Sequence, residues 1–206
     1  MIENPDALSI IRFHDRKLTD SCWPQAGIVE TDSSVWLWIE ANHRYNTLLW
    51  KEEDKARRVD VGAHEIAAGK RLIDQYNQKR NDATEAIDEA ILTELNHSAS
   101  GDGARLNSET AGAMIDRLSI LSLKIFHMRE QTRRADAGLE HVRRCEAKLE
   151  RLNEQRMDLG ACFDALMADA AAGRAYFKVY RQFKMYNDPA LNPYLYGAGE
   201  PQRSAL

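Results

Sequence analysis

The chain has 206 residues, of which 44% are hydrophobic and 29% charged, and its formal net charge at pH 7 is −4. This length supports one well-buried core, and the composition is typical of a folded globular protein rather than a disordered one. A negative net charge gives no general attraction to nucleic acid or to an anionic membrane, so we expect no nucleic-acid partner.

The sequence indicates neither membrane insertion nor secretion. Its longest uninterrupted apolar run, Val35–Ile39, is far shorter than the ~20 residues that a transmembrane helix needs. The first segment, Met1–Lys17, mixes charges with apolar residues and has no signal-peptide core. Three widely spaced cysteines, Cys22, Cys145 and Cys162, suit reduced thiols. We therefore expect a cytoplasmic protein with no membrane span.

Long helices should dominate the fold, because only 11 glycines and 5 prolines interrupt the chain. In chain order, hydrophobic periodicity predicts helices over about 4–21, 32–58, 63–97, 108–131, 135–172 and 173–186. No segment shows the alternation that is typical of a strand. The prediction is an all-α fold, an antiparallel bundle of about five to six long helices with an extended C-terminal tail.

We expect these elements to form one domain over residues 1–206. Its parts are an N-terminal helix and loop over 1–31, a helical hairpin over 32–97, a central helix with a coiled-coil-like arm over 108–186, and a tail over 187–206.

The arm, over 135–172, carries apolar residues at the spacing of a coiled coil. One heptad position holds Val142, Leu149, Arg156 and Phe163, and the other holds Cys145, Leu152, Leu159 and Leu166. Such a seam packs on another helix, which belongs either to the same chain, at 63–97 or 108–131, or to a second copy. The chain is thus predicted to be a monomer or a homodimer through this helix.

Polar side chains interrupt the apolar face of the helix predicted over 32–58. That face is defined by Val35, Trp38, Ile39, Leu49 and Trp50. Asn42, Asn46 and Glu53 lie in the middle of it, and Arg57 lies close by. Because a buried amide or carboxylate is costly without a partner, this face must meet polar groups of another helix or a ligand.

The next two helices supply such polar groups. On the helix over 63–97, Arg80 interrupts the apolar stripe, and a polar stripe beside it holds Lys70, Asp74, Asn77, Asn81, Glu85 and Asp88. The helix over 108–131 is apolar nearly all round, which predicts a central position. Its charged residues, Asp116, Arg117, Lys124 and His127, share one arc and cannot all reach solvent from a central helix.

Amides, carboxylates and cations should therefore meet between these three helices. One interpretation is a hydrogen-bonded network that fixes the register of the helices. The other is a pocket for an anionic ligand, because perturbed ionisable groups cluster at functional sites and arginine matches phosphate oxygens. The candidate ligand-binding residues are Asn42, Asn46, Glu53, Arg57, Asp74, Asn77, Arg80, Asn81, Asp116, Arg117, Lys124 and His127.

Magnesium is the cofactor that the acidic residues suggest. Glu53, Glu85 and Asp88 lie on neighbouring helices, and Mg²⁺ needs only one or two carboxylates plus phosphate oxygens. The pattern loosely resembles the EExxE and ExxD motifs of all-α nucleoside triphosphate pyrophosphatases, although positions 49, 50 and 56 hold no acid. Alternatively, Glu53 forms a surface ion pair with Arg57, one helical turn away, and binds no metal.

Four segments resemble a bacterial family of short helical proteins of unknown function. They are LLWKEEDKARR (Leu48–Arg58), KRLIDQYNQKRNDATEAID (Lys70–Asp88), LNSETAGAMIDRLSILSLKIFHM (Leu106–Met128) and KMYNDPALNPYLY (Lys184–Tyr196). The resemblance covers about residues 42–196, and its most specific part is LNSET…IDRLSIL. Some members of that family lie near genes for glycosyltransferases of lipopolysaccharide or other surface glycans. The resemblance implies a bacterial cytosolic protein and no particular reaction.

Three functions stay open on the sequence. The chain binds, or acts on, an anionic phosphorylated or sugar-nucleotide ligand in the pocket between the second, third and fourth helices, in cell-surface glycan synthesis. Alternatively, it is a non-catalytic helical accessory whose partner is another protein of such a pathway. The third alternative is a Mg²⁺-dependent nucleotide pyrophosphatase. These residues do not decide whether the chain is an enzyme.

Overall fold

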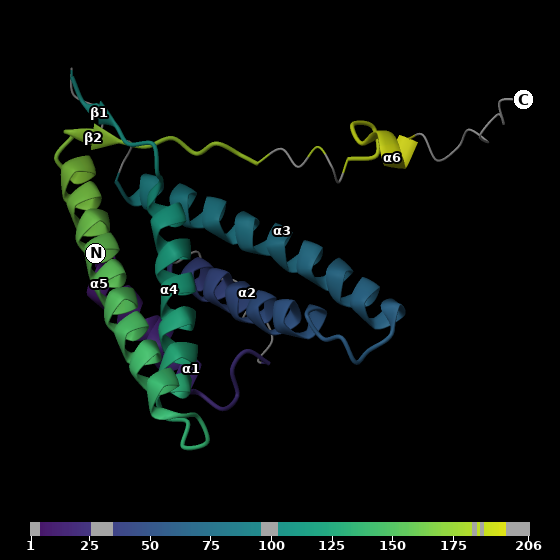
Figure 1. The fold of residues 1–206 in the computed structure, drawn as a ribbon. Coiled ribbons are helices and arrows are strands. Elements are labelled where there is room, and N and C mark those ends of the chain that lie inside the picture. The colour runs from purple at the N-terminus through teal and green to yellow at the C-terminus, as the bar shows by residue number, and fades with distance from the viewer. Residues whose placement is uncertain (1–4, 26–34, 96–102, 183–184, 186–187, 197–206) are drawn as a thin grey trace, which may run out of the picture.

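The computed structural model is built from α-helices (Figure 1). It describes residues 5–25, 35–95, 103–182, 185 and 188–196. The elements are α1 (Ala7–Thr19), α2 (Val35–Ala56), α3 (Ala63–Glu94), β1 (Arg105–Leu106), α4 (Ala111–Thr132), α5 (Leu139–Ala171), β2 (Ala175–Tyr176) and α6 (Pro193–Tyr196). The predicted all-α fold is confirmed. Among the helices in these ranges, none combines the length and apolarity that a bilayer crossing requires.

Two antiparallel hairpins make up most of the molecule. α2 and α3 form the first, with Gly62 as the N-cap of α3, and α4 and α5 form the second, with Gly138 as the N-cap of α5. Figure 1 shows α4 between α5 and the α2–α3 hairpin, and the α2–α3 hairpin points away from the α4–α5 hairpin. α1 packs against both α4 and α5. The two hairpins therefore contact each other mainly through α4.

α4 is the central helix, as its nearly continuous apolar surface predicts. Ile115, Leu118 and Ile125 have no exposed surface. Thr110 caps the helix by accepting a hydrogen bond from the backbone N–H of Ala113 at 3.2 Å. The surrounding core residues include Ile10, Ile39, Ile87, Ile91, Phe163 and Leu166. One contiguous core thus joins α1 to α5.

The coiled-coil-like seam of α5 faces the interior of the chain. Cys145, Arg156, Leu159, Phe163 and Leu166 are buried, and α5 packs mainly on α4 and also on α1. The remaining seam residues, Val142, Leu149 and Leu152, are partly exposed. The intramolecular hairpin is therefore present, whereas the oligomeric state stays a prediction.

The helix predicted over 173–186 is wrong over residues 173–182. α5 ends at Ala171, and Gly173 adopts the left-handed conformation, with φ of 68°, which favours glycine. Ala175 and Tyr176 then pair in parallel with Arg105 and Leu106, and the chain continues without helix to residue 182. A small two-stranded sheet thus lies in a chain for which no strand was predicted.

Two further details differ from the sequence-based expectation. α1 begins at Ala7, later than the predicted start near residue 4, because Asp6 is its N-cap and the Asp6 carboxylate accepts the backbone N–H of Ser9 at 2.6 Å. Trp38, expected on the buried face of α2, is 42% exposed. α3 ends at Glu94, and residues 96–97 of the helix predicted over 63–97 lie outside the described residues.

Candidate functional site

The predicted polar cluster is centred on the carboxylate of Asp116, on α4. Its Oδ1 accepts hydrogen bonds from the side-chain amides of Asn42 and Asn46 of α2, both at 2.8 Å. Asn42 also donates to Thr84 of α3, and Asn46 donates to Ser119 of α4, both at 3.1 Å. Because both amides are buried, these bonds tie three helices together in one register.

The network continues to two buried histidines, His14 and His43, that the sequence analysis missed. His43 Nδ1 lies 2.8 Å from Ser119 Oγ, and the His43 and His14 rings stack with their centroids 4.4 Å apart. Burial lowers the pKa of His43 to about 3 and that of His14 well below its ordinary value. Both rings are therefore neutral at pH 7. The available signal was that His43 follows Ile39 by one helical turn and shares its buried face.

Arg80, on α3, lies at the open edge of this network. Its Nε is 3.9 Å from Asp116 Oδ1, and its Nη2 donates to Asn81 at 3.0 Å. Asn81 donates in turn to Gln182 at 2.7 Å, which holds the extended segment after β2 against α3. Arg80 also lines two surface hollows, which are described below. It therefore connects the buried network with the surface.

Four adjoining hollows, of about 390, 430, 620 and 570 Å³, follow one face of α4. Neighbouring hollows share lining residues. Arg80 borders the first and second, and Arg117 borders the second and third. Lys124 borders the third and fourth, and Trp50 borders the fourth and first. The structure thus has one depressed face with several hollows, where the sequence analysis expected a single cavity.

Most of the predicted ligand-binding residues border this face. The hollow of about 390 Å³ is lined by Asn46, Glu53, Arg57, Asn77 and Arg80, that of about 430 Å³ by Arg80, Asn81, Asp116 and Arg117, and that of about 570 Å³ by Lys124 and His127. Asn42 is fully buried beneath the face, and Asp74 pairs with Lys70 at 2.7 Å on the exposed side of α3. Arg117 and Lys124 are exposed, so these two charges of α4 do reach solvent.

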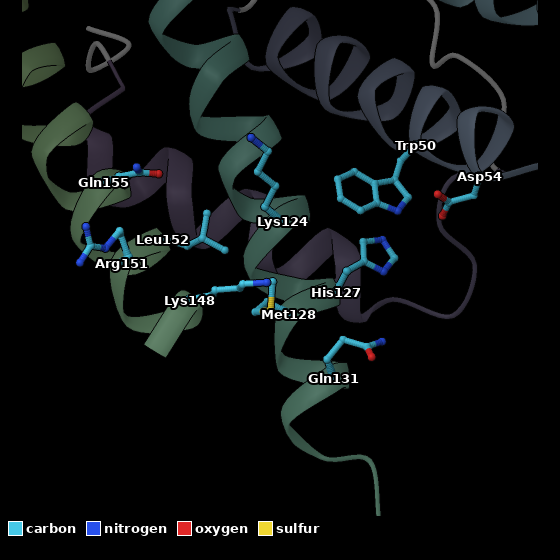
Figure 2. A pocket seen from close by; sticks show the side chains of 10 residues that line it. All are labelled: Trp50, Asp54, Lys124, His127, Met128, Gln131, Lys148, Arg151, Leu152 and Gln155. Atoms are coloured by element: carbon cyan, nitrogen blue, oxygen red, sulfur yellow. The ribbon is translucent and has the colours of Figure 1, made fainter. Parts of the chain in front are cut away.

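The hollow of about 570 Å³, named the aromatic hollow here, lies where α2, α4 and α5 meet (Figure 2). Its lining residues are Trp50, Asp54, Lys124, His127, Met128, Gln131, Lys148, Arg151, Leu152 and Gln155. The rings of Trp50 and His127 stack, with centroids 4.6 Å apart and planes 7° from parallel. Burial lowers the pKa of His127, so its imidazole is mainly neutral at pH 7 and stacks as an uncharged ring.

Three cations border the aromatic hollow: Lys124 on α4, and Lys148 and Arg151 on α5. Within the described ranges, none of the three forms an ion pair or a hydrogen bond. Figure 2 shows Lys148 reaching from α5 toward Met128 on α4, whereas Arg151 projects from α5 away from the stacked rings. Like charges gathered without acidic partners raise the local positive potential, which attracts an anion.

The predicted magnesium ligands do not form a group. Glu53 pairs with Arg57 at 3.1 Å and borders a different hollow from Glu85 and Asp88. Asp88 accepts the backbone N–H of Gly112 at 2.6 Å, and burial raises its pKa to about 6. In the part of the chain that the structure describes, no three His, Cys, Asp or Glu side chains are placed to hold a metal ion. The magnesium prediction therefore gains no support from geometry.

Lys148 and Arg151 were not predicted as site residues, because exposed charges on a long helix are ordinary. A signal did exist: Lys148, Arg151 and Gln155 follow one another at helical spacing beside the seam residue Leu152. Charges flanking an apolar seam border whatever groove lies next to that seam.

The fold and the site define an all-α protein of two hairpins, with a depressed face on α4 and a cation-bordered aromatic hollow. A family model described as "Protein of unknown function (DUF4254)" matches residues 36–179, and the chain belongs to this family. The matched range contains all residues that line the aromatic hollow. No curated protein and no solved structure matches the chain.

Proposed function

We propose that the chain binds an anionic phosphorylated ligand with an aromatic ring, of the nucleotide class, in the aromatic hollow. One observation carries the proposal: the stacked rings of Trp50 and His127 and the unpaired ammonium groups of Lys124 and Lys148 border the same hollow of about 570 Å³. An aromatic wall accepts a planar base by stacking, and ammonium groups accept phosphate oxygens.

The distribution of charge around the hollow supports a polarised ligand. Asp54 comes from α2 and lies beside the stacked rings, whereas Lys124, Lys148 and Arg151 come from α4 and α5 (Figure 2). A base with hydrogen-bond donors suits the side of Asp54, and phosphates suit the side of the cations. Unpaired like charges reduce the stability of a fold, and functional sites are where proteins retain them.

The network around Asp116 supports a separate, structural role for the interior polar residues. The amides of Asn42 and Asn46 already use the carboxylate of Asp116 as their common acceptor. A network whose members satisfy one another fixes helix register without a ligand. We therefore assign ligand binding to the aromatic hollow and not to the interior network around Asp116.

Sugar nucleotides belong to the proposed ligand class. The resemblance to bacterial proteins encoded near glycosyltransferases of surface glycans favours them among the nucleotides. On this proposal the chain is a cytosolic binding protein of a surface-glycan pathway in bacteria, and binding requires no turnover.

A melting-temperature screen tests the proposal. The probes are the diphosphates of uridine, guanosine, cytidine and adenosine, with inorganic pyrophosphate as a ligand that lacks the ring. At least one nucleoside diphosphate should raise the melting temperature by about 3 °C or more, and by more than pyrophosphate does, because a ligand that binds only the folded state stabilises it.

Matched variants of α5 place the effect in the aromatic hollow. Lys148→Gln should remove the rise, whereas Arg143→Gln should keep it, because Arg143 is exposed on the same helix and does not line the hollow. A panel in which no nucleotide shifts the melting temperature, or a full shift in Lys148→Gln, contradicts the proposal.

A further inference from the structure

A second hollow continues the aromatic hollow along the groove between α4 and α5. It has a volume of about 620 Å³ and shares Lys124 and Gln155 with the aromatic hollow. We call it the α4–α5 hollow. Because the two helices are antiparallel, it lies toward the start of α4 and the end of α5, on the opposite side of Lys124 from the stacked rings. Each helical residue adds about 1.5 Å, so Asp158 lies about 15 Å beyond Lys148 along α5.

The side chains around the α4–α5 hollow differ from those around the aromatic hollow. Gln155 and Asp158 are exposed on α5, and neither forms a hydrogen bond or an ion pair with a described residue. Glu109 is occupied by Arg117, whose Nη1 donates to both of its carboxylate oxygens, at 2.7 and 2.8 Å. One free carboxylate and one free amide therefore border this hollow, and its arginine is already neutralised.

Apolar side chains from both helices line the interior of the α4–α5 hollow. Met114, Ile120 and Leu121 come from α4, and Leu159 comes from α5. A hollow with an apolar wall and hydrogen-bond acceptors at its rim matches a ring that has C–H groups on its face and hydroxyls at its edge.

We infer that the α4–α5 hollow is a subsite for a neutral, hydroxyl-rich ring that is joined to the phosphates of the bound nucleotide. The inference rests on the proposed function and extends it by naming the residues that recognise this ring. The Asp158 carboxylate accepts hydrogen bonds from ring hydroxyls and repels a further phosphate, so the hollow selects against a longer polyphosphate. Lys124, which borders both hollows, lies where the phosphates that join the two rings pass.

Calorimetric titration with paired probes tests the inference. The pairs are UDP with UDP-glucose, and GDP with GDP-mannose. For the base that the protein accepts, the sugar conjugate should bind about tenfold more tightly than its diphosphate, as expected for hydrogen bonds to a charged acceptor. Asp158→Asn should abolish this preference and leave the affinity for the diphosphate unchanged.

Glu154→Gln serves as the control, because Glu154 is exposed on α5 one turn away and does not line the α4–α5 hollow. This variant should keep the preference for the sugar conjugate. Equal affinities of wild-type protein for conjugate and diphosphate overturn the subsite and leave the proposed function standing. An equal loss of both ligands in Asp158→Asn also overturns it. If no nucleoside diphosphate binds, the proposed function and the subsite fail together.

Discussion

The backbone N–H of Gly112 donates a hydrogen bond of 2.6 Å to the buried carboxylate of Asp88, so α4 begins directly against α3. A Cβ atom at Gly112 would collide with the backbone carbonyl oxygen of Thr84 and with the Asp88 side chain. The close approach of the two hairpins at this point therefore depends on glycine.

Gly112→Ala should lower the free energy of unfolding by about 2–3 kcal/mol, because backbone atoms must move to admit the methyl group. Gly69→Ala in α3 should have the opposite effect and raise it by about 0.5–1 kcal/mol, because alanine favours helix and the nearest atom, Glu52 Oε2, is 4.0 Å away. Urea unfolding measures both values. A Gly112→Ala protein that unfolds at the wild-type urea concentration contradicts this account of the hairpin junction.

Acidification should destabilise the fold through the buried histidine pair. Burial lowers the pKa of His14 and of His43, the latter to about 3. Below about pH 6.5, the unfolded chain therefore binds protons on these rings that the folded chain does not. The free energy of unfolding should fall by up to about 1.4 kcal/mol per pH unit for each ring.

Asp88 opposes this trend, because its pKa is raised to about 6 from 3.8. Between these values the folded chain binds a proton that the unfolded chain releases, so this group stabilises the fold as the pH falls. Two histidines outweigh one aspartate, and stability should still decrease from pH 7 to pH 5. Urea unfolding across this range should show a smaller decrease for His14→Phe and a larger one for Asp88→Asn. A wild-type stability that is constant or rises toward pH 5 would falsify the assignment of the histidine pair.

The polar network and the aromatic hollow should respond differently to substitution. Asp116→Ala removes the acceptor shared by Asn42 and Asn46, and should cost about 2–4 kcal/mol because buried amides are left unpaired. Lys124→Ala and Arg117→Ala should each cost less than about 1 kcal/mol, because both side chains are exposed. If Lys124, which lines the aromatic hollow, proved as costly to remove as Asp116, it would belong to the scaffold and the binding proposal would lose its basis.

The seam of α5 predicts a monomer in dilute solution, because its buried residues already contact α4 and α1. Phe163→Ala should lower the free energy of unfolding by about 3–5 kcal/mol by leaving a core cavity. Light scattering over a hundredfold dilution should give a constant mass for wild-type protein. A mass that halves on dilution would instead place a second copy on the partly exposed seam residues Val142, Leu149 and Leu152.

The sequence predicted the fold where periodicity was long and unambiguous. α4 contributes most of its residues from Ala111 to Ile125 to the buried core, and its pattern required a central position. The prediction of a helix after Gly173 was wrong, because the short apolar run of this segment fits a helix and a strand alike. Ala175 and Phe177 are buried in alternation, which is the strand signal, but the two-residue partner β1 exists only through tertiary contact.

The site was predictable in part for a related reason. Helical periodicity placed Asn42, Asn46 and Asp116 on faces that meet between the same helices. In the structure, both amides do donate to the Asp116 carboxylate. The hollows themselves depend on how far neighbouring helices diverge, and helical periodicity carries no information about that divergence. Lys148 and Arg151 border a hollow only because α5 packs where it does.

The most direct test of the binding proposal is a calorimetric titration of one variant pair with the nucleoside diphosphate that gives the largest rise in melting temperature. Wild-type protein and Arg143→Gln should bind it with equal affinity. The double variant Lys124→Gln/Lys148→Gln should bind it at least about a hundredfold more weakly, because each lost charge-assisted hydrogen bond costs roughly 1.5–3 kcal/mol. Unchanged affinity in the double variant, with its melting temperature intact, would show that the aromatic hollow is not the binding site.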